Sequence, residues 1–245
     1  MENHTKASYF SFAIILAAGL VIASIILANT WSSVASRNAT ITVTGSATKD
    51  IRSDLAEWSG TFSNESSSLS DAYAKLKESN SKVRAYLIGK GFEEGMLKFS
   101  AINTTNLYST NAQGYKTEQI VGYRLSQDVS IESSDVDKID KLSRDATELI
   151  NQGVEINSYP PQFFYTKLGD LKVEMIGLAS EDAKLRAEQI AKSTSDDIGE
   201  VRSSRTGVIQ ITSKNSTDVS DYGINDTSSL EKKITAVVSI SFSID

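Results

Sequence analysis

The sequence predicts an α+β domain, a mainly antiparallel sheet with amphipathic helices packed on it, preceded by one transmembrane helix. Several segments alternate apolar and polar residues, which is typical of half-buried strands. Three others repeat apolar residues every three or four positions, which is typical of amphipathic helices. After an uncharged apolar run near the N-terminus, the predicted order is ββαββαβαββ. Such mixing of strand pairs and helices favours antiparallel sheet with helices on one face.

The N-terminal run extends from Tyr9 to Leu27 without a charged residue. At about 1.5 Å per residue it matches the ~30 Å hydrocarbon core of a bilayer. We therefore predict a cytoplasmic tail at 1–8, a transmembrane signal anchor at 9–28 and a linker at 29–39. The alternative is a cleaved leader, because Ser33-Val34-Ala35 resembles a cleavage site. The apolar run exceeds the roughly 7–15 residues of a signal-peptide core, which favours the uncleaved anchor.

This topology places residues 40–245 outside the cytoplasm. The predicted location is the cytoplasmic (inner) membrane, single-pass, with a periplasmic C-terminal domain, or a secreted periplasmic form if the leader is cleaved. The chain has no cysteine. In an oxidising compartment the fold then relies on its own core, for which about 200 residues suffice.

The first part of the exported domain predicts two strands and a helix. Residues 41–45 alternate apolar and polar side chains, and 55–62 form the second strand. Ser68 then opens a helix that Gly89 and Gly91 end. The predicted apolar face of this helix consists of Leu69, Ala72, Tyr73, Leu76, Val83 and Leu87.

A long hairpin and a second helix follow. Strands are predicted at 96–107 and 120–131, joined by a polar loop that contains Gly114. The helix has Asp135 near its positive end and stops at Gly153. Its predicted inner face is Val136, Ile139, Leu142, Ala146, Leu149 and Ile150.

The last part predicts an interrupted strand, a long helix and two closing strands. Residues 154–166 are extended but contain Pro160-Pro161, which cannot donate to a sheet ladder. Strands are predicted at 201–212 and 234–244, with a flexible loop at 214–233 between them. The helix, about 170–192, has small alanines that let another element pack closely. Its predicted apolar residues are Leu171, Met175, Leu178, Ala179, Ala183, Ala187, Ile190 and Ala191.

Composition excludes several kinds of chemistry. His4 is the only histidine and cysteine is absent, so Cys-His or Ser-His-Asp catalysis and His/Cys zinc sites are not available to the domain. A net charge of -6 lacks the electrostatic footprint of nucleic-acid binding. Gly89, Gly91 and Gly95 resemble a dinucleotide fingerprint, but their last spacing is one residue too long and they end a helix. We predict no catalytic, cofactor-binding or metal site, and no enzyme.

Acidic and aromatic residues offer weaker candidates. Asp218, Asp221 and Asp226 could gather around a hard cation, but their spacing misses the EF-hand pattern and favours a solvated loop. Glu93-Glu94 and Asp196-Asp197 are sequence neighbours, which seldom face one another, so they indicate surface. Seven aromatic residues could line a ligand pocket or an interface, with core filling favoured for Tyr123, Phe163 and Tyr165. The set is Tyr108, Tyr115, Tyr123, Phe163, Phe164, Tyr165 and Tyr222.

A succession of short motifs across residues 40 to 245 resembles the SIMPL-domain family. They are Ile41-Thr42-Val43-Thr44-Gly45, Gly91-Phe92, Gly122-Tyr123-Arg124, the run from Asp182 to Ala191 and Ile198-Gly199-Glu200-Val201. Where the family usually has glycines, this chain has Ala47 and Ser195. The resemblance implies an exported, periplasmic or envelope-attached bacterial protein and a tendency to form ring-like or channel-like homo-oligomers. Some members are linked to oxidative-stress tolerance, and the family supplies no catalytic residues.

Two functional hypotheses follow. The first is a membrane-anchored cell-envelope protein whose exported domain self-assembles or binds envelope partners without catalysis. The resemblance adds a stress-related role to this hypothesis. The partners expected are further copies of the chain, the membrane through the N-terminal helix, and an envelope protein, but no nucleic acid. The alternative is a small-molecule-binding or carboxylate- and metal-assisted hydrolytic periplasmic domain, which predicts carboxylates and aromatics converging in one pocket.

Overall fold

The computed structural model describes residues 16–31 and 39–244. The predicted cytoplasmic tail, residues 9–15 of the predicted anchor and residues 32–38 of the predicted linker lie outside the described residues. Residues 16–31 form a helix with exposed apolar side chains, among them Leu16, Ile26 and Leu27. None of the helices within 16–31 and 39–244 combines the length and the apolar character needed to cross a membrane.

The rest of the chain forms two compact units. Among the described residues, the first contains 39–47, 172–208 and 235–244, and the second contains 48–171 and 209–234. Both units are built from sheet and helix, which confirms the α+β class. The sequence predicted one antiparallel sheet, and the structure has two.

The first sheet has the strand order β1-β10-β8, and β9 also pairs with β10. These strands are β1 (Thr40–Arg52), β8 (Ile198–Thr206), β9 (Gln210–Ser213) and β10 (Glu231–Ile244). The β8–β10 ladder is antiparallel, with Val238 opposite Thr206. The single strand predicted at 201–212 is wrong, because the ladder of β8 ends before Gly207 and β9 begins after it.

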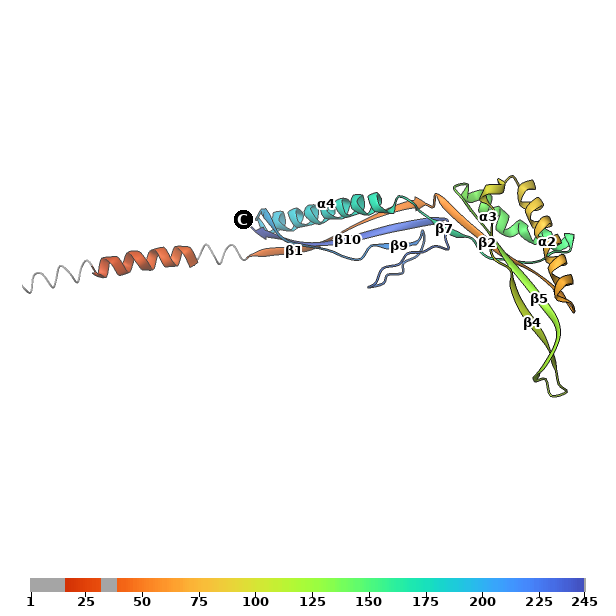
Figure 1. Cartoon of the computed structure of the whole chain (residues 1–245). Coiled ribbons are helices and arrows are strands. Elements are labelled where there is room, and N and C mark those ends of the chain that lie inside the picture. Colours follow the sequence, from red (N-terminus) through yellow and green to blue (C-terminus); the bar gives the residue numbers. More distant parts are fainter. Residues whose placement is uncertain (1–15, 32–38, 245) are drawn as a thin grey trace, which may run out of the picture. The chain divides into compact units, whose positions relative to one another are not determined.

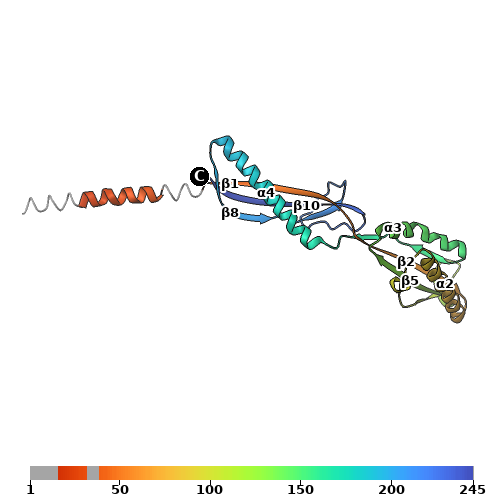
Figure 2. The ribbon, with the colours of Figure 1, turned by 90° about the horizontal axis from the view of Figure 1, so that it is seen from above.

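Helix α4 (Leu168–Thr194) covers one face of this sheet, and both views show it lying across β1 and β10 (Figures 1 and 2). Contact is closest at Gly45, where a Cβ would lie 2.2 Å from the carbonyl oxygen of Ala179 and 2.7 Å from Cα of Ala183. This confirms the close packing predicted from the alanines. The stripe is narrower than predicted, because Leu178 and Ile190 are exposed.

The second sheet has the strand order β3-β5-β2-β6, with β4 pairing with β5 and β7 with β2. Its central ladder is antiparallel and runs from Ala56 opposite Ser133 to Ser66 opposite Tyr123. The single strand predicted at 96–107 is divided in two, and Pro160-Pro161 separates β6 from β7 as predicted. The strands are β2 (Leu55–Ser66), β3 (Lys98–Phe99), β4 (Asn103–Thr110), β5 (Lys116–Ser133), β6 (Glu155–Ser158) and β7 (Gln162–Phe164).

Two helices and two 3-10 helices complete the second unit. They are α2 (Leu69–Gly89), η1 (Glu94–Met96), α3 (Val136–Asp145) and η2 (Ala146–Gln152). Leu76 and Leu87 of α2 and Ile139 of α3 pack with sheet residues such as Trp58 and Phe62 in one buried cluster. The indole nitrogen of Trp58 donates to Ser158 Oγ at 2.9 Å, so its polar atom is satisfied.

The predicted helix faces and ends are largely confirmed. Leu69 and Tyr73 of α2 and Ile150 of η2 are exceptions, because they lie at the edge of the apolar stripe and are exposed. Asp135 caps α3 by accepting from the backbone N–H of Lys138. Gly91 after α2, with φ of 84°, has the left-handed conformation that ends helices, which confirms the helix-end interpretation of these glycines.

Candidate interaction surface on the β4–β5 hairpin

Strands β4 and β5 form a hairpin with a tightly bonded turn. The carboxamide Oδ1 of Asn111 accepts from the backbone N–H groups of Gln113 at 3.1 Å and Tyr115 at 2.9 Å. Gly114 has φ of 82°, which a side chain would disfavour, so the predicted turn glycine is confirmed. Ser109 and Thr117 also share a hydroxyl hydrogen bond across the strands next to the turn.

The outer part of the hairpin lies beyond the rest of the sheet. The β2–β5 ladder ends at the pair Ser66–Tyr123, and Leu107 opposite Gly122 is the first pair past it. We call residues 107–122 the arm, and Figure 1 shows it running out to the turn between β4 and β5. Among the described residues the arm has no strand on either side, and β4 has no neighbour other than β5. Isolated two-stranded ribbons are marginally stable in water, so this geometry favours a further partner.

Apolar side chains of the arm face solvent. Tyr108 and Ile120 lie opposite each other across the ladder and are 41% and 43% exposed. Val121 is 50% exposed and Tyr115 72% exposed. Grouped apolar and tyrosine side chains on a protein surface are characteristic of interaction sites.

The open edge of β4 also lacks the charges that normally protect such edges. No residue from Phe99 to Tyr115 is charged. Edge strands usually carry lysine, proline or other features that prevent pairing with another chain. The edge strand β8 follows this rule, since it contains Glu200, Arg202 and Arg205. An uncharged, proline-free edge with exposed apolar residues is therefore the best candidate surface for β-strand pairing with a partner.

Comparison with known proteins identifies the family. The sequence model of the SIMPL family, described as "Protein of unknown function (DUF541)", matches residues 41–242, which is most of the chain. The chain belongs to the SIMPL family. This confirms the resemblance predicted from the motifs. No curated protein is similar enough to the chain to count as a match.

The aromatic residues of the SIMPL domain divide into core and surface. Phe163 is 5% exposed and Tyr123 packs partly buried against the core, as favoured for both. Phe164 and Tyr165 are half-buried. Tyr222, on the loop after β9, is 97% exposed, as Tyr108 and Tyr115 of the arm are also exposed. The exposed members favour an interface over a ligand pocket.

The SIMPL domain buries one ion pair that the sequence reasoning missed. The side chain of Lys232 is 2% exposed, and its ammonium donates to the backbone carbonyl of Asp226 at 2.7 Å and lies 3.6 Å from Oδ2. Burial lowers the pKa of Lys232. Burial alone would raise the pKa of Asp226, but hydrogen bonds from Ser228 and Ser229 and the charge of Lys232 lower it to about 2. The carboxylate of Asp226 is therefore ionised at neutral pH, and its contacts with Lys232 anchor the loop to β10.

A signal for this lysine was present in the sequence. The predicted strand began at Ile234, but β10 begins at Glu231 and its buried residues alternate from Lys232 to Phe242. Lys232 thus lies on the same face of the strand as its buried apolar residues. Residues 231–233 of the predicted flexible loop belong to β10, and flexibility of the remainder stays a prediction.

The acidic residues of the loop do not gather as a metal site. Asp218 and Asp226 line a polar hollow of about 300 Å³ with serine and threonine hydroxyls, and Asp221 is not part of its lining. A separate hollow, which Asp226 lines with Phe163, Phe164 and Tyr165, is only about 40 Å³, roughly the volume of one water. At Asp226, the carboxylate and the aromatic residues therefore converge only where an organic molecule has no room.

The adjacent acidic pairs lie at the surface. Glu94 forms an ion pair with Arg84, and Glu93, Asp196 and Asp197 are exposed. Across the described ranges no three acidic or histidine side chains are arranged to hold a metal ion.

Proposed function

We propose that this SIMPL protein is a membrane-anchored cell-envelope protein whose exported domain self-assembles or binds envelope partners without catalysis. Its proposed location is the inner membrane, with residues 40–245 in the periplasm. The observation that carries the proposal is the arm, which combines open strand edges with exposed apolar side chains.

Strand pairing is the proposed mode of contact. Backbone N–H and C=O groups on an open edge supply the same hydrogen bonds to any extended chain, and neighbouring side chains supply specificity. On the arm, Tyr108 and Ile120 are placed to bury apolar area when β4 gains a neighbour. A second copy of the hairpin presents the same uncharged edge, so it meets no charge repulsion.

Features of the N-terminal helix support the proposed anchor. Among the described residues nothing covers its apolar side chains, since Leu20, Ile22 and Ile25 are each more than half exposed. Its hydroxyl groups are satisfied inside the helix, because Ser24 Oγ and Thr30 Oγ1 each donate to the carbonyl four residues earlier at 2.8 Å. A helix with internally satisfied polar groups suits a lipid environment.

The direct test is the mass of the purified full chain in detergent, measured by analytical ultracentrifugation. Wild type is expected to sediment as an oligomer or with a copurified envelope protein. Asn106→Lys, which places a charge on the open edge of β4, is expected to shift it to the monomer. Ser204→Lys on β8 is the matched control and should leave the mass unchanged. A monomeric wild type with no bound partner would contradict the proposal.

The polar hollow beside Asp226 favours one second candidate, binding of a small polar molecule. Asp218, Asp226 and several hydroxyl groups could hydrogen-bond a polyhydroxylated or cationic compound there. A thermal-shift screen of such compounds and divalent ions tests it. A shift that Asp218→Asn abolishes would support this candidate, and no shift with any compound would remove it.

A further inference from the structure

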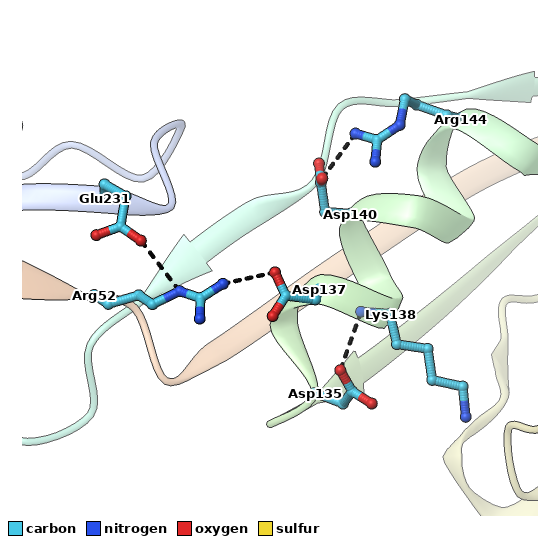
Figure 3. A network of polar contacts seen from close by, with 7 residues as sticks. All are labelled: Arg52, Asp135, Asp137, Lys138, Asp140, Arg144 and Glu231. Atoms are coloured by element: carbon cyan, nitrogen blue, oxygen red, sulfur yellow. Dashed lines mark hydrogen bonds and ion pairs between the residues drawn. The ribbon is translucent and has the colours of Figure 1, made fainter.

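Two acidic side chains of helix α3 form ion pairs with arginines. Arg52 holds Asp137 at 2.6 Å and also reaches Glu231 at 3.2 Å, and Arg144 holds Asp140 at 2.7 Å. Figure 3 shows these pairs together, with the side chain of Lys138 extending away from them. Asp137 and Asp140 are thus paired with arginines and not with the lysines of α3.

The lysines of α3 line a hollow of about 190 Å³. Lys138 and Lys141 are three residues apart, which places them on the same side of the helix, and Lys90 after α2 completes the basic lining. Lys138 Nζ donates to the carbonyl of Gly91 at 2.6 Å and lies 4.4 Å from the centre of the Phe92 ring. Buried Phe92 and Leu142 provide the apolar part of the lining.

The charges in the hollow do not cancel. Lys90 Nζ lies 3.1 Å from Asp145 and 3.0 Å from Glu148, and these hydrogen bonds raise the pKa of Lys90. Both local carboxylates are therefore bound by one lysine. Within the part of the chain that the structure describes, neither Lys138 nor Lys141 forms an ion pair with a carboxylate. Three lysines thus face two carboxylates, which leaves the hollow with a net positive charge in a chain of net charge -6.

We propose that this hollow binds a phosphate group. Its volume equals that of about six waters, which is enough for phosphate and a small attached group. An ammonium is a compact point charge with three donors, and Lys138 uses one of them on Gly91. Such donors match a tetrahedral phosphate. Lysine binds phosphate as a point charge, without the bidentate geometry of arginine.

The test measures the melting temperature of the full chain in detergent with inorganic phosphate and with chloride at equal ionic strength. Bound phosphate raises the melting temperature, since it binds the folded state. Phosphate also stabilises proteins without binding, so variants are essential. Lys141→Gln should retain the wild-type melting temperature in chloride and bind phosphate about tenfold more weakly. Lys138→Gln should weaken binding as well.

Lys77→Gln, at an exposed position of α2, is the matched control and should respond to phosphate as wild type does. Equal responses of wild type and both hollow variants would overturn the proposal, as would a wild-type response no larger in phosphate than in chloride. A second arm replaces phosphate with monomeric short-chain phosphatidylglycerol. Tighter binding of this lipid, lost in Lys141→Gln, identifies a headgroup as the source of the phosphate, and equal or weaker binding identifies a soluble phosphate.

Discussion

Tyr108 and Ile120 lie directly opposite each other on the arm, and both remain more than one third exposed. Cross-strand aromatic–aliphatic pairs stabilise sheets when neighbours cover them. On the arm no neighbour of the described chain does so. The pair therefore stabilises the sheet fully only when another strand packs beside it.

Replacing this pair should affect assembly more than folding. Tyr108→Ser with Ile120→Ser removes exposed apolar area, so unfolding of the dissociated chain should change by only about 0.5 kcal/mol. Assembly should weaken, because the buried area lost on association is apolar. Sedimentation across a concentration series measures the association, and the substitution Val208→Ser, also at an exposed position, is the control. Unchanged association in the double variant would count against the arm.

The contact of Gly45 with α4 predicts a large loss of stability in Gly45→Ala. The added Cβ would lie 2.2 Å from the Ala179 carbonyl oxygen, and that atom belongs to backbone that cannot rotate away. We expect a cost of about 3 kcal/mol from forced separation of helix and sheet. Gly177→Ala in the same helix meets no atom within 4 Å and should gain about 0.5–1 kcal/mol. Denaturant unfolding measures both, and similar effects of the two would refute the packing argument.

Replacing Ser195 with glycine should stabilise the fold. Ser195 has φ of 67°, the left-handed conformation that glycine adopts most readily. Its N–H donates to Lys192 and that of Asp196 to Ala191, so the backbone is held in this helix-ending turn. Ser195→Gly should stabilise the protein by about 1 kcal/mol, because the Cβ strain is removed. Ala47 does not have positive φ, so Ala47→Gly should destabilise by about 0.5–1 kcal/mol. A destabilising Ser195→Gly would contradict this assignment.

The ion pair of Asp226 and Lys232 predicts acid sensitivity. The pKa of Asp226 is about 2 in the fold, below its ordinary value of 3.8. The stabilisation is present above pH 3.8 and is lost as pH falls through about 2, by roughly 2 kcal/mol. Asp226→Asn should remove this part of the fall in unfolding free energy at acid pH. It should also cost about 3 kcal/mol at pH 7, because Lys232 stays buried without its partner.

Unfolding free energies measured from pH 7 to pH 2 provide the test. Asp218→Asn is the control, since Asp218 lines the same hollow but is exposed and has no ion pair among the described residues. If the unfolding free energy of Asp226→Asn falls at low pH as much as that of wild type, Asp226 does not cause the acid sensitivity.

Local periodicity predicted most of the fold, because a half-buried strand and an amphipathic helix each leave a pattern in their own residues. The six buried residues of α4 and the alternation of β10 are examples. The predictions that failed concerned features that depend on contacts between residues distant in sequence. Nothing local distinguishes two sheets from one, or shows that β2 ends at Ser66 while β5 continues to Lys116. The arm therefore became visible only in three dimensions.

The sequence predicted that exposed aromatic residues would form an interface, but it did not predict where on the fold this interface lies. Exposed aromatics were expected to favour an interface, and core filling was favoured for Phe163 but not for Tyr108 or Tyr115. The place of Tyr108 and Tyr115 together on the arm became known only from the structure. Lys232 was overlooked because a lysine is rarely fully buried. Its partner Asp226 lies on an irregular loop, whose path no periodic pattern specifies.

Photo-crosslinking in intact cells tests the central claim most directly. A benzoylphenylalanine at position 106 of the full chain reports what lies beside the open edge of β4, and the same residue at exposed position 77 of α2 reports chance encounters. We predict a defined adduct at 106, with a second copy or an envelope protein, and none at 77. A chain that stays uncrosslinked at 106, or crosslinks equally at both positions, would contradict the proposal that the protein acts through this edge.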